Sequence, residues 1–131
     1  MSRKHGLDGT ARADHAQAER EQEARANLID LGAGELAAQP WRPAPVPSSA
    51  VDLVHFALWR SADIPPEGVL SALTLLPAAR AELVGLEAGL LFTARSAGLT
   101  WAQIAQAMGF NSPQACQQHY NRLSGANGSD A

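Results

Sequence analysis

The sequence predicts an all-α protein, a small helical domain of about five helices. Three observations predict this class. From Val51 onward, apolar residues recur three and four positions apart, which is the spacing of one helix face. Apolar and polar residues do not alternate with a period of two over a useful length, so strands are not expected. In residues 98–123, two short segments with apolar faces are joined at a glycine, and each begins with a helix-capping residue.

Length and charge limit what the chain can be. Its 131 residues give room for one domain and a tail. The net charge of −3 argues against a general binder of polyanions, which needs a strongly basic face. Residues 88–129, however, carry Arg95 and Arg122 and no acid, whereas the rest holds eight Lys and Arg against thirteen Asp and Glu. Any contact with phosphate is therefore expected from the C-terminal part.

Composition also argues against several kinds of site. The single cysteine excludes a disulfide within the chain and a cysteine zinc site. The four histidines are scattered without metal-ligand spacing, so we expect no metal, no cofactor and no enzymatic activity. The apolar run Leu83–Phe92 is interrupted by Gly and Glu and is too short to cross a bilayer. We expect a cytoplasmic, nucleoid-associated protein without membrane contact.

Residues 1–48 are expected to form a flexible N-terminal region. Residues 1–10 are polar and contain glycine, and they are expected to be disordered. Residues 11–31 are rich in helix formers, and two interpretations stand: a solvated, partly formed helix, or a charged helix that binds a protein partner or dimerises. Four prolines in residues 40–47 exclude a helix and favour an extended linker. Within it, Trp41 either packs onto the domain or is an exposed indole.

The domain itself is expected over residues 49–124. A first helix should run over residues 50–60, and the pair Pro65-Pro66 suits the first turn of a second. Pro77 is expected to restart the chain into a long third helix over residues 78–97. The apolar stripe of that helix, expected to lie in the core, includes four residues spaced seven apart: Leu76, Leu83, Leu90 and Ala97.

The last two helices are expected to form a helix-turn-helix. Gly98 can adopt a positive φ and so ends the third helix, and Thr100 with Gln103 gives a capping box for the next, over residues 101–108. Ala105 is small enough for the following helix to approach closely, and Gly109 suits a left-handed turn. Ser112 caps the final helix, with Pro113 at its first position. No wing is expected, because residues 125–131 read as a disordered tail.

The spacing of Ala105, Gly109 and Ala115 is typical of helix-turn-helix DNA-binding units. Residues 79–123 resemble the helix-turn-helix of bacterial transcription regulators and of the promoter-reading domain of sigma factors. They are most similar to small actinobacterial regulators whose second helix reads Ser-x-Gln-Ala-x-x-x-x-Tyr-x-Arg-Leu. In this chain that pattern is Ser112, Gln114, Ala115, Tyr120, Arg122 and Leu123. The resemblance implies binding to double-stranded DNA.

A helical wheel divides the final helix into two faces. The face expected to pack on the domain holds Ala115, Cys116, Tyr120 and Leu123. The opposite face, expected to contact base edges in the major groove, holds Gln114, Gln117, Gln118 and Asn121. Amides pair well with adenine, so sites containing A·T pairs are expected. Phosphate contacts are expected from Arg95, Ser112 and Arg122.

Three side chains near these faces are expected to be structural. His119 should be a half-buried histidine with a partner, Cys116 a small apolar filler of the core, and Trp101 a core anchor. The related regulators carry arginines where this chain has Gln118 and His119. With so few cations a single copy should bind DNA weakly, which favours a homodimer or a helping protein.

The predicted function is sequence-dependent binding of duplex DNA, as a transcriptional regulator or a small nucleoid-associated protein. The alternative is a helical protein-interaction or dimerisation module that does not bind DNA directly. The low basic count and the acidic N-terminal half favour this alternative. The two hypotheses differ in salt dependence, because only a DNA binder loses affinity for DNA as salt rises.

Overall fold

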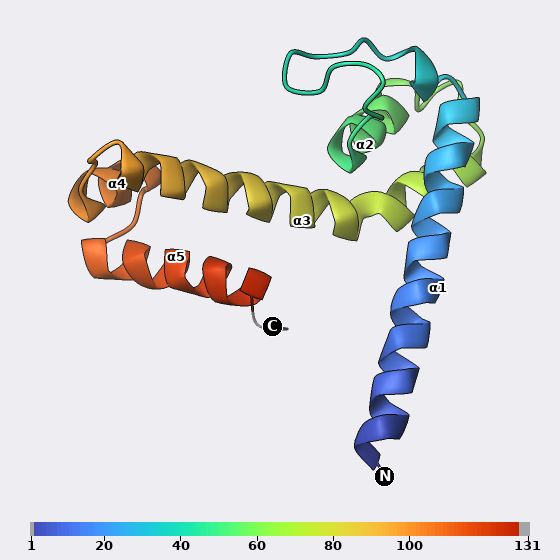
Figure 1. The fold of residues 1–131 in the computed structure, drawn as a ribbon. Helices are drawn as coiled ribbons and strands as arrows, with labels where there is room; N and C mark the ends of the chain where they lie inside the picture. Colours follow the sequence, from blue (N-terminus) through green and yellow to red (C-terminus); the bar gives the residue numbers. More distant parts are fainter. Residues whose placement is uncertain (1, 129–131) are drawn as a thin grey trace. The chain divides into compact units, whose positions relative to one another are not determined.

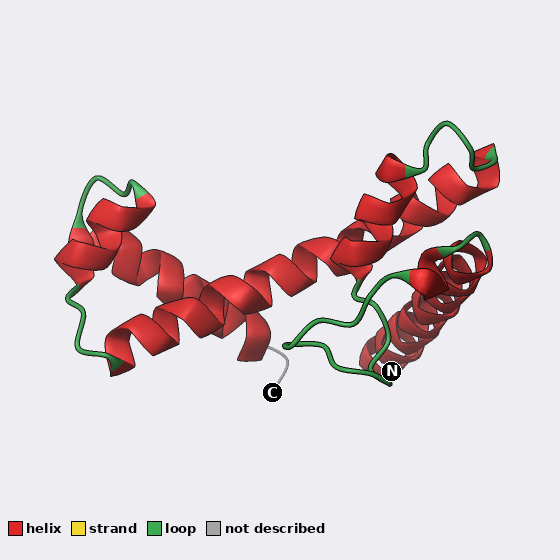
Figure 2. Ribbon diagram, turned by 90° about the horizontal axis from the view of Figure 1, so that it is seen from above, coloured by secondary structure: helices red, strands yellow, loops and turns green. Residues whose placement is uncertain are grey.

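The computed structural model describes residues 2–128, with side chains from residue 9 to residue 125. It is helical throughout this range, with loops between the helices (Figures 1 and 2). The elements are α1 (Ser2–Asp30), the short 3-10 helix η1 (Ala33–Glu35), α2 (Ala50–Trp59), α3 (Pro66–Ser96), α4 (Trp101–Met108) and α5 (Pro113–Gly128). The predicted all-α class is confirmed. The chain divides into two compact units, Met1–Arg80 (unit 1) and Ala81–Ala131 (unit 2).

The helix α1 is longer than the sequence predicts. It begins at Ser2, whereas residues 1–10 were expected to be disordered. Glycines lower helix propensity by about 1 kcal/mol each, but they do not forbid a helix that continues into a strong helix-forming segment. Near its other end Ala24 and Leu28 are buried, so this part of α1 packs within its own chain. The wholly solvated, partly formed helix is therefore wrong for residues 24–28, whereas residues 9–15 of α1 are exposed.

The core of unit 1 joins α1, α2 and the first part of α3. Gly32, at φ 125°, ends α1, and Ser49 caps α2 by accepting a hydrogen bond from the Asp52 N–H at 3.1 Å. The Asn27 amide donates to Ser71 Oγ at 2.8 Å and links α1 with α3. The buried cluster consists of Ala24, Leu28, Ala33, Ala50, Leu53, Phe56, Ala57, Ala72, Leu75 and Ala79. Because Ala24, Leu28 and Ala33 belong to this cluster, the region before residue 49 is partly integrated into a folded unit.

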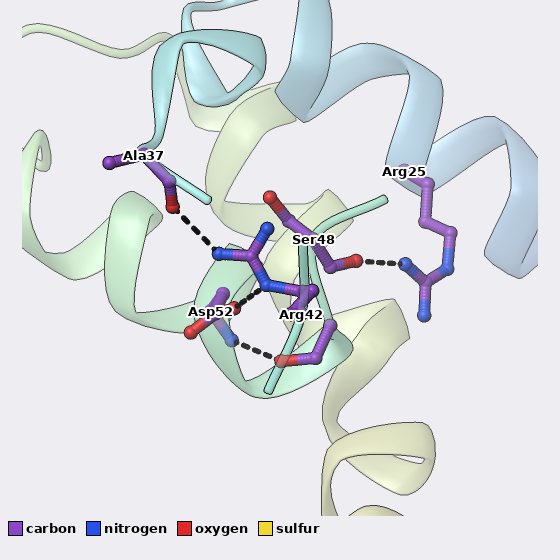
Figure 3. Close-up of polar contacts among 6 residues, drawn as sticks. Arg25, Ala37, Arg42, Ser48 and Asp52 are labelled. Carbon is purple, nitrogen blue, oxygen red and sulfur yellow. Dashed lines mark hydrogen bonds and ion pairs between the residues drawn. The ribbon is translucent and has the colours of Figure 1, made fainter. Parts of the chain in front are cut away.

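The proline-rich segment is attached to unit 1 by an arginine rather than by its tryptophan. Trp41 is 81% exposed, so the second of the two alternatives, an exposed indole, is correct. The buried Arg42 donates to the Ala37 carbonyl at 2.9 Å, and its Nε forms an ion pair with Asp52 Oδ2 at 3.1 Å (Figure 3). Arg25 donates to the Ser48 carbonyl at 2.8 Å, at the end of the same segment.

Pro77 does not restart the chain, and one continuous helix α3 replaces the predicted second and third helices. A proline inside a helix removes one hydrogen bond and crowds the carbonyl four residues earlier, at a cost of about 3 kcal/mol, so other interactions must hold the helix together. Leu75 and Ala79, on either side of it, are buried in the same cluster, which holds both turns in place. The described residues therefore form five α-helices, the number predicted. One of the five is α1, however, and the single helix α3 replaces two predicted helices.

The predicted core stripe of α3 is largely in water. Leu83 is 55% exposed and Leu90 is 71% exposed, although both were expected to be buried. By length and apolar composition α3 meets the criterion for a membrane span among the described helices, and 17% of the relevant stretch is buried. Dividing the helix at Pro77 leaves only short apolar runs such as Leu83–Phe92, so a helix of this length was not expected. Core helices of soluble proteins meet the same criterion, so it does not place α3 in a membrane.

The final helix α5 extends beyond the predicted end of the domain. It reaches Gly128, whereas a disordered tail was expected from residue 125. The glycines near its end disfavour a helix without terminating it. The remainder of the predicted tail, residues 129–131, lies outside the described residues.

Candidate nucleic-acid interface

The start of α4 is fixed by a complete capping box. Gly98, at φ 89°, ends α3, and the Leu99 N–H donates to the Ala94 carbonyl at 3.0 Å. Thr100 Oγ1 accepts from the Gln103 N–H at 3.1 Å, and Gln103 Oε1 accepts from the Thr100 N–H at 2.8 Å. The two side chains thus satisfy donors that a helix start leaves unpaired. These predictions are confirmed.

The turn between α4 and α5 spans residues 109–112. Gly109 has φ 81°, the left-handed conformation predicted for it, and the Phe110 N–H donates to the Ala105 carbonyl at 2.9 Å. Ser112 Oγ accepts from the Ala115 N–H at 3.1 Å, and α5 begins at Pro113. The turn and its cap therefore form as the local sequence predicts.

The two helices pack on each other around a small core. Ile104, Ala105 and Cys116 are buried with Leu91 of α3. Ala105 is 3% exposed, which confirms that a small residue lies where α4 and α5 meet. The half-buried side chains that complete this core are Ala94, Trp101, Phe110, Tyr120 and Leu123. The predicted inner face of α5 is therefore the face that packs, and Trp101 contacts the Tyr120 ring at a centroid distance of 5.6 Å.

His119 ties α5 to α3 within unit 2. Its Nε2 lies 2.9 Å from Glu87 Oε1, and its ring lies 5.2 Å from the Phe110 ring. The side chain is 26% exposed, so the prediction of a half-buried histidine with a partner is confirmed. The partner could not be predicted from local sequence, because Glu87 lies 32 residues away and no local pattern links the two.

Cys116 occupies the centre of this core. It has no exposed surface, as expected of an apolar filler. Burial raises the pKa of its thiol, and the negative charge of Glu87 raises the pKa further. Both effects keep the sulfur protonated, which is the less reactive form.

The outer face of α5 carries four exposed amides. They are Gln114, Gln117, Gln118 and Asn121. At 100° per residue these side chains span about 100° of the helix circumference. The apolar side of the same helix is used for packing, so this face is left for contacts outside the chain. The structure thus brings together all four residues predicted to contact bases.

The three residues predicted to contact phosphate are placed differently from one another. Arg122 is exposed on α5, next to the amide face. The Ser112 hydroxyl already accepts the capping hydrogen bond. Arg95 donates to the Leu99 carbonyl at 2.9 Å, and its guanidinium lies 4.9 Å from the centre of the Trp101 ring. Arg95 therefore stabilises the junction of α3 and α4. Of the three residues, Arg122 is the one whose positive charge lies beside the amide side chains.

No family model, no curated protein and no solved structure matches this chain.

Two further features of the described residues concern metal binding and the ion pair of Asp52. Among the side chains that the structure describes, no group of three or more His, Cys, Asp or Glu is arranged to hold a metal ion. Asp52 forms its ion pair with Arg42 and stabilises the fold of unit 1.

Proposed function

We propose that unit 2 binds double-stranded DNA in a sequence-dependent manner, with α5 in the major groove. In this proposal the protein is a transcriptional regulator or a small nucleoid-associated protein of the cytoplasm, acts as a homodimer, and has no catalytic role. The observation that carries the proposal is the outer face of α5, where four exposed amides lie opposite the packed side of the helix. The resemblance of this segment to bacterial helix-turn-helix regulators supports the same reading.

Amide side chains suit base reading better than phosphate binding. Asn and Gln can donate to N7 and accept from N6 of adenine in the major groove, and each such pair contributes about 1–3 kcal/mol of discrimination. An α-helix fits this groove, and in helix-turn-helix proteins the N-terminal residues of the second helix contact the bases. Gln114 and Gln117 lie in the first turns of α5, where such contacts are made.

The direct test is selection of random duplex DNA on the purified protein at about physiological salt, followed by sequencing of the retained DNA. An enriched motif with two half-sites about one helical turn apart would support a dimeric regulator. Retention without enrichment would support nucleoid-type binding. Absence of retention would contradict the proposal.

A paired substitution tests the assignment of the base-reading helix. Gln114→Ala with Gln117→Ala should reduce the preference between the best and a scrambled site by at least about 10-fold, because each lost amide pair removes about 1–3 kcal/mol of discrimination. Competition binding with the two duplexes measures this ratio. Gln22→Ala, an exposed amide of α1, is the matched control and should leave the ratio unchanged. An unaltered ratio in the double variant would remove α5 from base reading.

The alternative function is a protein-interaction module that does not contact DNA. The placement of Arg95 on Leu99 and Trp101 favours it, because this arginine is already engaged within the chain. The two functions separate in a salt titration. A DNA complex weakens as salt rises, whereas assembly through apolar surfaces is insensitive to salt or strengthened by salting-out ions.

A further inference from the structure

Unit 1 has an open pocket between residues 36–42 and the helix α2. Its volume is about 260 Å³, and all of its lining belongs to unit 1. Small-molecule sites occupy about 300–1,000 Å³, so this pocket has room for a single small ring with a substituent. The side chains that give the pocket its chemistry are Leu36 and Arg42 on one side and Asp52, Phe56 and Trp59 of α2 on the other.

The buried Arg42 has more hydrogen-bond donors than partners. It is 9% exposed, and a guanidinium carries five N–H donors. Nη2 donates to the Ala37 carbonyl, whereas Nη1 makes no contact with the residues drawn in Figure 3. Nε forms an ion pair with Asp52 but has no hydrogen-bond partner. Because donors left unpaired at a buried group are unfavourable, this side chain suits a ligand that brings an acceptor oxygen to Nη1.

The charges in the lining indicate which kind of oxygen fits. Asp52 already neutralises Arg42, and its carboxylate lines the same pocket. A ligand carboxylate would be repelled by Asp52, whereas a neutral carbonyl oxygen requires only the donors of the arginine. His55, the remaining titratable group of the lining, is exposed to solvent, where the effect of a charge is screened. The pocket therefore favours a neutral acceptor.

Two aromatic rings of α2 indicate the rest of the ligand. Phe56 is 2% exposed, whereas Trp59 is 74% exposed. Their ring centroids lie 6.4 Å apart, and the ring planes meet at 70°. A flat ring that stacks on one of them meets the other edge to face, and both geometries are favourable for aromatic pairs. An aromatic ligand would thus cover an indole that the chain leaves in water.

We propose that this pocket binds a small neutral aromatic amide, whose carbonyl oxygen accepts from Arg42 and whose ring packs against Trp59. An apolar lining with a few polar groups that fix orientation is the usual composition of a small-molecule site. The pocket lies in unit 1, whereas the amide face of α5 lies in unit 2. The proposal is therefore independent of DNA binding.

Three related probes test the site on the unaltered full-length protein, by saturation-transfer NMR titration. Benzamide should bind with a dissociation constant of about 1 mM or lower. Toluene, which has the ring without the oxygen, should bind at least about 10-fold more weakly, because the donors of Arg42 stay unpaired. Benzoate should also bind more weakly than benzamide, because its charge is repelled by Asp52. Absence of benzamide binding at about 10 mM, or toluene or benzoate binding as tightly as benzamide, would overturn the proposal.

A pair of tryptophan substitutions tests where benzamide binds. Trp59→Ala should raise its dissociation constant about 3–10-fold, because the stacking contact is lost. Trp41→Ala is the matched control, since this indole is similarly exposed but does not line the pocket, and it should leave the constant unchanged. Circular dichroism checks that both variants keep their helix content. Benzamide binding that is unchanged in Trp59→Ala, or weakened equally in Trp41→Ala, would contradict the assignment to this pocket.

Discussion

At the scale of single residues, the Cys116 thiol gives a prediction with a defined pH dependence. Burial and the nearby Glu87 carboxylate raise its pKa, so the folded protein keeps the proton at a pH where the unfolded chain has lost it. Stability should therefore fall as the pH rises above the ordinary thiol range. Iodoacetamide should modify the folded protein at pH 8 at least roughly 10-fold more slowly than the urea-unfolded protein. Equal rates would show that the sulfur is accessible.

Single residues also show which contacts can be read from sequence. The caps at Thr100 and Ser112 and the left-handed Gly109 were predictable, because each depends on residues within three positions. The pairing of His119 with Glu87 was not, because their contact exists only once α5 lies on α3. The same holds for Arg42 and Asp52, whose ion pair depends on the path of the proline-rich segment.

At the scale of elements, the meeting of α4 and α5 depends on the size of Ala105. Ala105→Leu should lower the free energy of unfolding by about 1–3 kcal/mol, because Ala105 is 3% exposed and three more carbons would overpack the buried site. Urea denaturation monitored by circular dichroism measures this loss. Ala102→Leu is the control, since Ala102 is exposed on the same helix and should tolerate leucine. Similar stability of the two variants would mean that Ala105 does not limit the approach of α5.

The long helices show why elements were harder to predict than caps. Pro77 is a strong local signal for a helix end, yet burial of Leu75 and Ala79 in one cluster keeps α3 continuous. The stripe of Leu83 and Leu90 has the periodicity of a core, but periodicity does not tell which molecule covers it. An apolar stripe predicts burial correctly only when its partner lies in the same chain.

At the scale of the whole molecule, the proposed DNA binding depends on the small number of cations near the amide face. One copy carries Arg122 beside the amide face, and the exposed Arg95 adds a second phosphate contact if it exchanges its hydrogen bond to Leu99 for a phosphate; a dimer doubles both. The slope of log affinity against log salt is about −0.9 for each phosphate neutralised. The wild-type dimer should therefore give a slope of about −3.6, steeper than one copy could give.

Removal of one of these cations should reduce the slope. Arg122→Ala removes one cation from each copy, so it should bring the slope to about −1.8. Arg20→Ala, which removes an exposed arginine of α1, should leave it unchanged. Fluorescence anisotropy with one labelled duplex across a salt series measures the wild type and both variants. If Arg122→Ala has the same slope as the wild type, Arg122 contacts no phosphate, and the cation beside the amide face does not take part in DNA binding.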